Sequence, residues 1–251
     1  PYRLVQTDSR GRPYHGRPFR FWNRCMTASL AFVFPGQGSQ SVGMVADLAA
    51  RDTSVRATFD EASEGAGVDL WTLSQQGPEE QLNQTEYTQP ALLAASVGAW
   101  GLWQAKGGAT PAALAGHSLG EYSALVAAGA LELRDAAKLV RLRGQLMQAA
   151  VPAGTGAMVA VLGAEDAVIE AACADAAQGE VVVPANFNTP GQVVIGGQAA
   201  AVDRAVALLA ERGVRKVVKL AVSVPSHTPL MRDAATPLAE AMKGITWRAP
   251  S

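Results

Sequence analysis

The sequence predicts an α/β protein in which a small unit is inserted into a larger one. In the first half of the chain, short apolar strands at residues 30–34 and 112–116 each run into a glycine-rich turn. Residues 156–220 then follow the order strand, helix, strand, strand, helix, strand. The composition fits a globular chain, because 49% of the 251 residues are hydrophobic and only 17% are charged.

The larger unit begins with a buried strand. Residues 30–34 are apolar and β-prone, and they stop at Pro35-Gly36, which marks the start of a loop. From residue 55 onward, helical patterns are interrupted by glycine and proline until an alanine-rich run. The second short strand, from Ala112, turns at Gly116 into another helix. The periodicity predicts the helices of this unit at residues 42–50, 89–105, 121–128 and 133–149.

The smaller unit has the βαββαβ order of the ferredoxin-like split unit. Its strands are expected at residues 157–162, 181–186, 192–195 and 215–220, and its helices at 164–177 and 199–211. A turn at Thr189-Pro190-Gly191 separates the two central strands. We therefore expect a small domain at residues 154–220 and a large domain built from residues 26–153 and 221–251.

Residues 1–25 differ in composition from the rest of the chain. They hold six arginines against one acid, Asp8, whereas the whole chain has a net charge of −1. We interpret this leader as lying outside the native fold, with the natural start near Met26; a nucleic-acid-binding arm or a transit peptide are the alternatives. The leader lacks the apolar core of a secretory signal. The acidic remainder gives no reason to expect a nucleic acid as partner.

Cysteine usage and hydropathy indicate where the protein resides. The two cysteines, Cys25 and Cys173, are far apart and form no CxxC or Cys/His pattern, so neither a disulfide framework nor a metal site is expected. The alanine-rich segments are broken by glycine, proline or charge and do not reach the length of a membrane span. We expect a cytoplasmic protein with no membrane association.

A candidate nucleophile lies between the second strand and its helix. Gly116-His-Ser-Leu-Gly120 matches the GxSxG pattern of a nucleophile elbow in the expected strand–turn–helix context. Such a turn exposes the hydroxyl of Ser118 and directs the backbone N–H of Leu119 at the same point, close to the positive end of a helix. The alternative is a glycine-rich turn with an incidental capping serine.

A serine needs a base, and histidine is the usual one. The chain has three histidines: His15 lies in the leader, and His117 adjoins Ser118 on a tight turn where neighbouring side chains diverge. His227 remains, in a loop that returns the chain from the small unit to the large one, although a lone histidine is more often structural. By elimination, His227 is the candidate base.

A second glycine-rich loop follows the first strand. Residues 34–40, Phe-Pro-Gly-Gln-Gly-Ser-Gln, leave the same edge of a parallel sheet as the elbow does, so the N–H of Gln37 could complete an oxyanion hole. A phosphate-binding loop is the alternative. It is disfavoured because the GxxxxGK[ST] spacing and its lysine are absent.

Five segments, taken in order, resemble malonyl-CoA:acyl carrier protein transacylases of bacterial type II fatty acid synthesis. They are FPGQGSQ, GHSLGEYSALVAAGAL, LVRLRGQLMQ, NFNTPGQVVIGG and SVPSHTPLM, and the resemblance runs from about Met26 to the last residue. Acyltransferase domains of polyketide synthases share the serine and histidine motifs and are the nearest alternative. The resemblance implies an α/β-hydrolase-like large domain with a ferredoxin-like insert, and a Ser–His pair in place of a full triad.

The resemblance also implies roles for individual residues. Ser118 becomes the nucleophile, His227 the base, and the N–H groups of Gln37 and Leu119 the oxyanion donors. The substrates are malonyl-CoA and an acyl carrier protein, and coenzyme A takes part as a substrate rather than as a cofactor. Three further residues match substrate-binding positions: Arg143, Asn188 and Gln192.

Arg143 falls on the arginine that holds the free carboxylate of the malonyl group. A guanidinium suits that role, because it can hold a carboxylate by two charge-assisted bonds. Arg141, on another face of the same helix, is expected to form a surface ion pair instead. Asn188 and Gln192 match a cleft-lining motif, although Asn188 is equally explained as a turn residue before Pro190.

In one respect the chain departs from the family pattern. Members usually continue for several tens of residues past the position of Ser251, with a further strand, helices and a carbonyl that orients the histidine. We therefore expect a truncated chain with His227 poorly oriented and part of the sheet uncovered. Two other functions remain open: a hydrolase, in which Asp135, Asp166 or Asp203 orients the imidazole, and a binding module with a decayed site.

Overall fold

The computed structural model describes residues 30–152, 154–220, 222 and 224–250. The predicted leader at residues 1–25 and the predicted start at Met26 lie outside the described residues. Within the described part, the chain is a mixed α/β protein with one parallel and one antiparallel sheet. No helix in this part is long and apolar enough to cross a membrane.

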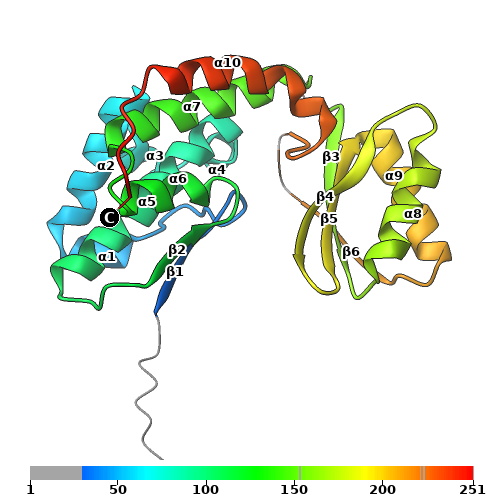
Figure 1. Cartoon of the computed structure of the whole chain (residues 1–251), viewed down its shortest axis with the longest axis horizontal. Coiled ribbons are helices and arrows are strands. Elements are labelled where there is room, and N and C mark those ends of the chain that lie inside the picture. Colours follow the sequence, from blue (N-terminus) through cyan, green and yellow to red (C-terminus); the bar gives the residue numbers. More distant parts are fainter. Residues whose placement is uncertain (1–29, 153, 221, 223, 251) are drawn as a thin grey trace, which may run out of the picture.

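The chain forms two lobes (Figure 1). The large lobe contains the parallel sheet and most of the helices, and the small lobe contains the antiparallel sheet. The helices of the large lobe are α1 (Ala46–Arg51), α2 (Thr53–Ala66), α3 (Leu70–Gln76), α4 (Glu79–Leu82), α5 (Thr85–Ala105), α6 (Gly120–Ala127), α7 (Leu133–Ala150) and α10 (Arg232–Lys243). A single 3-10 turn, η1 (Pro229–Met231), precedes α10.

The parallel sheet of the large lobe places the two glycine-rich turns together. Strands β1 (Ala31–Phe34) and β2 (Ala113–Gly116) pair in parallel, with Phe34 opposite Gly116. Both strands therefore end at one edge, where the chain continues into the loop after Phe34 and into the turn at Ser118. Val33, in the middle of β1, is 75% exposed.

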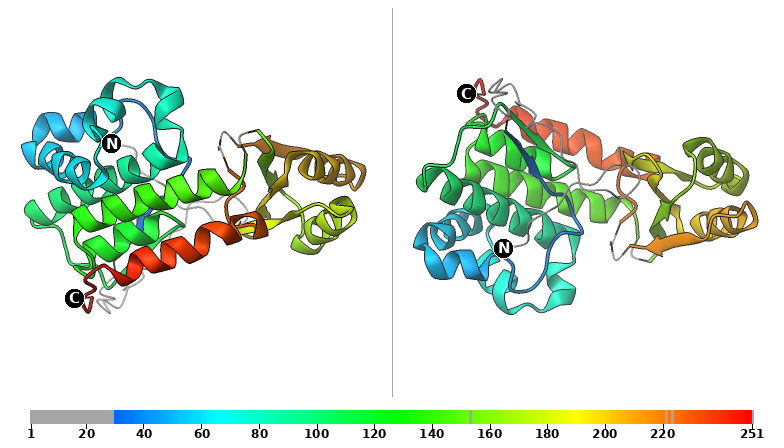
Figure 2. Two further views of the ribbon diagram at one scale, coloured as in Figure 1. Left: turned by 90° about the horizontal axis from the view of Figure 1, so that it is seen from above. Right: turned by 90° about the horizontal axis from the view of Figure 1, so that it is seen from below.

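The large-lobe core is helical. Helices α2, α5 and α7 pack on one another around buried side chains such as Phe59, Leu93 and Val140. Helix α10 lies beside α7 along the top of Figure 1, and the view from above in Figure 2 shows the same pair. Because η1 and α10 follow the small lobe in sequence, this packing returns the end of the chain to the large lobe.

The small lobe follows the predicted element order. Its elements are β3 (Gly156–Leu162), α8 (Asp166–Ala177), β4 (Val182–Thr189), β5 (Gln192–Gln198), α9 (Ala199–Glu211) and β6 (Lys216–Lys219). The strands pair antiparallel in the order β4-β5-β3-β6. Helices α8 and α9 cover one face of the sheet, and the other face is turned toward the large lobe (Figure 1). A separate apolar core, with Ile169, Ile195 and Leu209 fully buried, fills the space between the sheet and these helices.

Candidate active site

The turn that carries Ser118 is tightly constrained. The backbone of Ser118 has a φ of 53°, a left-handed conformation that is rare for residues other than glycine. A Cβ on Gly116 would lie 1.9 Å from the carbonyl carbon of Gly120, and one on Gly120 would lie 2.1 Å from the carbonyl oxygen of Phe34. Both flanking glycines are thus required by the close packing of strand, turn and helix.

Ser118 and His227 lie next to each other. The Nε2 atom of His227 is 2.8 Å from the Oγ atom of Ser118, which is hydrogen-bonding distance. The expectation that His227 is poorly oriented is therefore wrong with respect to its contact with Ser118. Within the described residues, however, the other ring nitrogen, Nδ1, has no recorded hydrogen-bond partner.

The loop that carries His227 is packed on the small lobe. Pro225, two residues earlier, is buried and lies over Gly156 at the start of β3, where an added Cβ would come within 2.5 Å of the proline Cδ atom. Thr228 is also buried, and its hydroxyl donates to the carbonyl of Pro225. The same loop contacts the large lobe, because the buried Val224 packs with Met147 of α7 and Ala234 of α10. The segment that carries the base therefore touches both lobes.

Burial and positive charge both lower the pKa of His227. Desolvation is the largest cause, and the charges of Arg143 and His117 add to it. Part of the residue still faces solvent, which limits the desolvation. The lowered pKa favours the neutral imidazole, the form that can accept a proton from Ser118.

Arg143 lies beside this pair. Its Nη2 atom donates to Ser118 Oγ at 3.3 Å, and its Nη1 atom donates to the side-chain oxygen of Gln89 at 2.7 Å. Its guanidinium also lies 5.8 Å from the ring centre of Tyr122. Burial lowers the pKa of Arg143, while Tyr122 and Glu121 oppose that shift. No carboxylate of the described residues lies within ion-pairing distance of it, so the site contains a partly buried cation without an ion-pair partner.

Gln37 is held close to the elbow. The backbone N–H of His117 donates to the carbonyl of Phe34 at 3.0 Å, which joins the loop after β1 to the elbow. The side chain of Gln37 donates to Thr85 Oγ1 at 2.9 Å, so α5 fixes it from the other side. Neither the backbone N–H of Gln37 nor that of Leu119 has a recorded partner among the described residues, which leaves both available to an oxyanion.

A cavity of about 200 Å³ joins these groups. Gln37, Ser118 and Arg143 line it from the large lobe, and Asn188 and Gln192 line it from the small lobe. Leu119, which follows Ser118 in the turn, is buried. The cavity is also lined by the following residues: His117, Met158, Ala160, Asn186, Val194, Leu220, Val222, Ser226 and His227.

His117 has a supporting position, as the sequence indicates. Its Nε2 atom lies 3.1 Å from Asn188 Oδ1, so the pair bridges the elbow and the small lobe. Arg141 forms an ion pair, as expected, with Glu86 at 3.7 Å, but both side chains are only 21% and 27% exposed, so the pair does not lie on the open surface. The sequence did not identify Gln89, which is fully buried and bonded to Arg143. Its one signal is a polar side chain at the start of an alanine-rich helical run.

The acids considered for a hydrolase lie elsewhere. Asp135 is in the first turn of α7 and Asp166 is in the first turn of α8. Asp203 is exposed on α9. No carboxylate hydrogen bond to His227 occurs among the described residues, so the geometry does not favour an acid-oriented triad.

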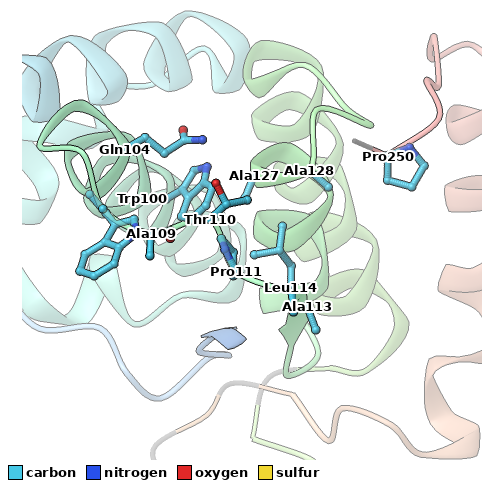
Figure 3. Close-up of a pocket in the computed structure, with 13 residues that line it drawn as sticks. Trp100, Gln104, Ala109, Thr110, Pro111, Ala113, Leu114, Ala127, Ala128 and Pro250 are labelled. Atoms are coloured by element: carbon cyan, nitrogen blue, oxygen red, sulfur yellow. Dashed lines mark hydrogen bonds between the residues drawn. The ribbon is translucent and has the colours of Figure 1, made fainter. Parts of the chain in front are cut away.

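Another hollow, of about 580 Å³, lies on the large lobe and shares no lining residue with the Ser118 cavity. Figure 3 shows Trp100, Leu114 and Pro250 around it. Among the described residues, the polar side-chain groups that line it are those of Gln104 and Thr110 and the indoles of Trp100 and Trp103, and no charged side chain lines it. It therefore offers no base or anion-binding group, and the chemistry is assigned to the cavity at Ser118.

Comparison with known proteins defines the class of the protein. Residues 31–251 match the family model described as the acyl transferase domain. The malonyl CoA-acyl carrier protein transacylase of Escherichia coli (strain K12) is 58% identical over 221 residues, which are 88% of this chain and 72% of that protein. The protein of the same name from Bacillus subtilis (strain 168) is 44% identical, over 86% of this chain and 68% of that protein. The chain belongs to the malonyl CoA-acyl carrier protein transacylase family.

Solved structures agree with this assignment. The malonyl-CoA:acyl carrier protein transacylase of Xanthomonas oryzae pv. oryzae matches with a TM-score of 0.87 and 74% identity, over 88% of this chain and 71% of that one. A type II PKS acyl-carrier protein in complex with its malonyl-transacylase matches with a TM-score of 0.87 and 56% identity, over 89% of this chain and 72% of that one. Both similarities extend across the two lobes described above.

Proposed function

We propose that this chain is a serine acyltransferase that moves a malonyl group from coenzyme A to the phosphopantetheine thiol of an acyl carrier protein. The observation that carries the proposal is the distance of 2.8 Å between Ser118 Oγ and His227 Nε2, in a cavity that also holds an unpaired arginine. Membership in the transacylase family supports malonyl-CoA as the donor and an acyl carrier protein as the acceptor.

In the first half-reaction, His227 takes the proton of Ser118, and the resulting alkoxide attacks the thioester carbon of malonyl-CoA. The N–H groups of Gln37 and Leu119 stabilise the oxyanion of the tetrahedral intermediate. Collapse of that intermediate breaks the carbon–sulfur bond, and His227 returns its proton to the thiolate of coenzyme A. The products are free coenzyme A and malonyl-Ser118.

In the second half-reaction, the carrier-protein thiol takes the place of coenzyme A. His227 accepts the thiol proton, the thiolate attacks the malonyl ester, and the same two N–H groups stabilise the second oxyanion. Ser118 leaves with the proton held by His227, which restores the starting state. Because water would hydrolyse the ester, exclusion of water from the occupied cavity would favour transfer over hydrolysis.

Arg143 selects the acyl group. A partly buried cation with no carboxylate within ion-pairing distance gains from an anionic ligand, since pairing offsets the cost of its desolvation. The free carboxylate of a malonyl group supplies such an anion, and an acetyl group does not. Asn188 and Gln192, which face the cavity from the small lobe, are proposed to contact the substrate there.

The remaining assignments belong to the same proposal. The reaction serves fatty acid biosynthesis in the cytoplasm, and neither a nucleic acid nor a membrane is a partner. A polyketide pathway is the alternative, since one similar solved structure contains a type II PKS carrier protein. We divide the chain into a ferredoxin-like domain at 154–220 and an α/β-hydrolase-like domain at 26–153 and 221–251. The strand order β4-β5-β3-β6 and the two separate cores support this division.

The test is acyl transfer from radiolabelled malonyl-CoA, followed by mapping of the labelled residue. We expect the label on Ser118, its release on addition of carrier-protein thiol, and no label in Ser118→Ala. Equal labelling of that variant would refute the acyl-serine. Rapid hydrolysis of neutral esters that Arg143→Ala leaves unchanged would instead assign the protein to the hydrolases.

A further inference from the structure

We propose that Gln40 is a positioning residue for the oxyanion hole, because its side-chain amide holds the loop that carries the backbone N–H of Gln37. The inference rests on the proposed role of Gln37, and it concerns a residue that does not line the Ser118 cavity. The oxyanion loop, residues 35–45, connects β1 to α1 and contains no helix or strand. Turn and side-chain hydrogen bonds therefore fix its shape.

Both polar atoms of the Gln40 amide are engaged. The Oε1 atom accepts from the backbone N–H of Gly38 at 2.8 Å, and the Nε2 atom donates to Asn83 Oδ1 at 2.8 Å. A backbone N–H can only donate, so Gly38 fixes which end of the amide faces it, and the other end must donate to Asn83. Gln40 thus ties the peptide that follows Gln37 to the segment between α4 and α5.

The two neighbours of Gln37 differ in their freedom to move. Gly36 is buried against the elbow, where an added Cβ would lie 2.7 Å from the carbonyl oxygen of His117. Gly38 has a φ of 103° and nothing within 4 Å of an added Cβ, so neither packing nor a side chain restrains it. The peptide at Gly38 can therefore rotate more easily than the one at Gly36, and its hydrogen bond to Gln40 opposes that rotation.

The attachment point is itself held in place. Asn83 ends α4, and its backbone N–H donates to the carbonyl of Glu79 at 2.9 Å. Thr85, the first residue of α5, is fully buried and accepts from the side chain of Gln37 at 2.9 Å. The oxyanion loop is thus attached to residues 83–85 at two points, once through Gln37 and once through Gln40.

A matched pair of glutamines tests this role. Gln40→Met keeps the length of the side chain and removes both hydrogen bonds. Gln75→Met is the control, because the Gln75 amide also holds the oxyanion loop, but at its far end, where it donates to the carbonyl of Met44 at 2.9 Å. Asn83→Leu removes only the anchor of Gln40, and it serves alone if Gln40→Met does not fold. Single-turnover acylation of Ser118 at varied malonyl-CoA gives the saturating rate and the apparent Kd.

We expect Gln40→Met to lower the saturating rate by about 10- to 100-fold, since a displaced oxyanion donor loses much of its effect. The apparent Kd should change by less than about 3-fold, and Gln75→Met should leave both quantities within about 3-fold. Asn83→Leu should lower the rate by about 3-fold or more. The double variant should be as slow as Gln40→Met alone, because Asn83 acts only through Gln40.

Three results would overturn the inference. They are a weaker apparent affinity with an unchanged rate in Gln40→Met, an equal loss of rate in Gln75→Met, and independent, multiplying losses in the double variant. The pH profile adds a fourth check, because a displaced oxyanion donor leaves the pKa of His227 as it is. A shifted acid limb in Gln40→Met would show that the substitution disturbs the Ser118–His227 pair instead, which also overturns the inference.

A fluorophosphonate keeps this inference distinct from the proposed function. When Ser118 attacks its phosphorus and fluoride leaves, the phosphoryl oxygen accepts from the same two N–H groups, and no thioester is needed. If malonyl-CoA forms no acyl-serine with the wild type, the proposed function fails. The inference then survives only if the fluorophosphonate modifies Ser118 and Gln40→Met slows this step by about 10-fold or more relative to Gln75→Met. Equal rates, or no modification of the wild type, overturn it.

Discussion

Ser118 has a backbone conformation that an L-amino acid rarely adopts. Its φ of 53° is imposed by the turn between β2 and α6. A side chain strains the backbone in this conformation, whereas glycine adopts it without strain. We expect Ser118→Gly to be more stable than Ser118→Ala by about 1 kcal/mol. Chemical denaturation of the two inactive variants measures this difference. Equal stability would mean that the turn relaxes around the side chain.

The lowered pKa of His227 sets the pH dependence of acylation. Desolvation and the charge of Arg143 both disfavour the imidazolium, so the base stays neutral below the ordinary histidine pKa of about 6.5. The acid limb of the acylation rate should therefore lie below that value. Removing the arginine charge makes protonation easier, so the limb should move up.

Arg143→Met tests this shift with acetyl-CoA as donor, since the acetyl group does not need the arginine. The rate of acyl-Ser118 formation is measured across pH for the wild type and for the variant. A limb that stays in place or moves to lower pH would show that Arg143 does not act on the imidazole.

Individual side chains differ in how far the sequence identifies them. The GxSxG pattern and the elimination of His15 and His117 predicted Ser118 and His227, and the structure places these two side chains together. Gln89 was missed because its partners lie on another helix, 54 and 58 residues away, and no local pattern encodes that pairing.

At the scale of the elements, the contact between α5 and α7 depends on Gly144. A Cβ at this position would meet the Cα atom of Glu86 at 2.5 Å and the carbonyl oxygen of Thr85 at 2.7 Å, and backbone atoms cannot rotate away. We expect Gly144→Ala to lower the free energy of unfolding by about 2 kcal/mol or more.

Gly101→Ala is the matched control for that substitution. Gly101 lies in α5, and an added Cβ would meet nothing within 4 Å. Alanine there should raise the free energy of unfolding by about 0.5–1 kcal/mol, because glycine is a poor helix former. Denaturant titration measures the free energy of unfolding of both variants. A similar change in Gly144→Ala and Gly101→Ala would contradict the steric explanation.

The sequence largely predicted which helices and strands form, but it predicted the first residues of the helices less well. The small lobe has the expected order because its apolar runs are short and clearly punctuated. Helix α1 begins at Ala46 instead of residue 42, since Gly43 and Val45 have positive φ angles that continue the loop. Helix α5 begins at Thr85, and Pro90 lies within it, whereas the pattern placed the start beside that proline.

At the scale of the whole molecule, the two lobes have separate cores. All five tryptophans lie outside residues 154–220, so their fluorescence reports on the rest of the chain. Ile195→Ala should destabilise the small-lobe core by about 3 kcal/mol. We expect the variant to shift the unfolding transition seen by circular dichroism and to leave the tryptophan transition in place. A common shift of both signals would show that the lobes unfold as one unit.

The loop that carries His227 packs on both lobes, and this has a mechanical consequence. Ser118 lies at the end of the parallel sheet, whereas His227 lies in a loop whose Pro225 packs on β3 and whose Val224 packs on α7. An opening of about an ångström would leave the hydroxyl without its proton acceptor. A compound bound between the lobes would therefore inactivate the enzyme without contacting either side chain. Each turnover requires the lobes to return to the arrangement in which Ser118 and His227 are within hydrogen-bonding distance.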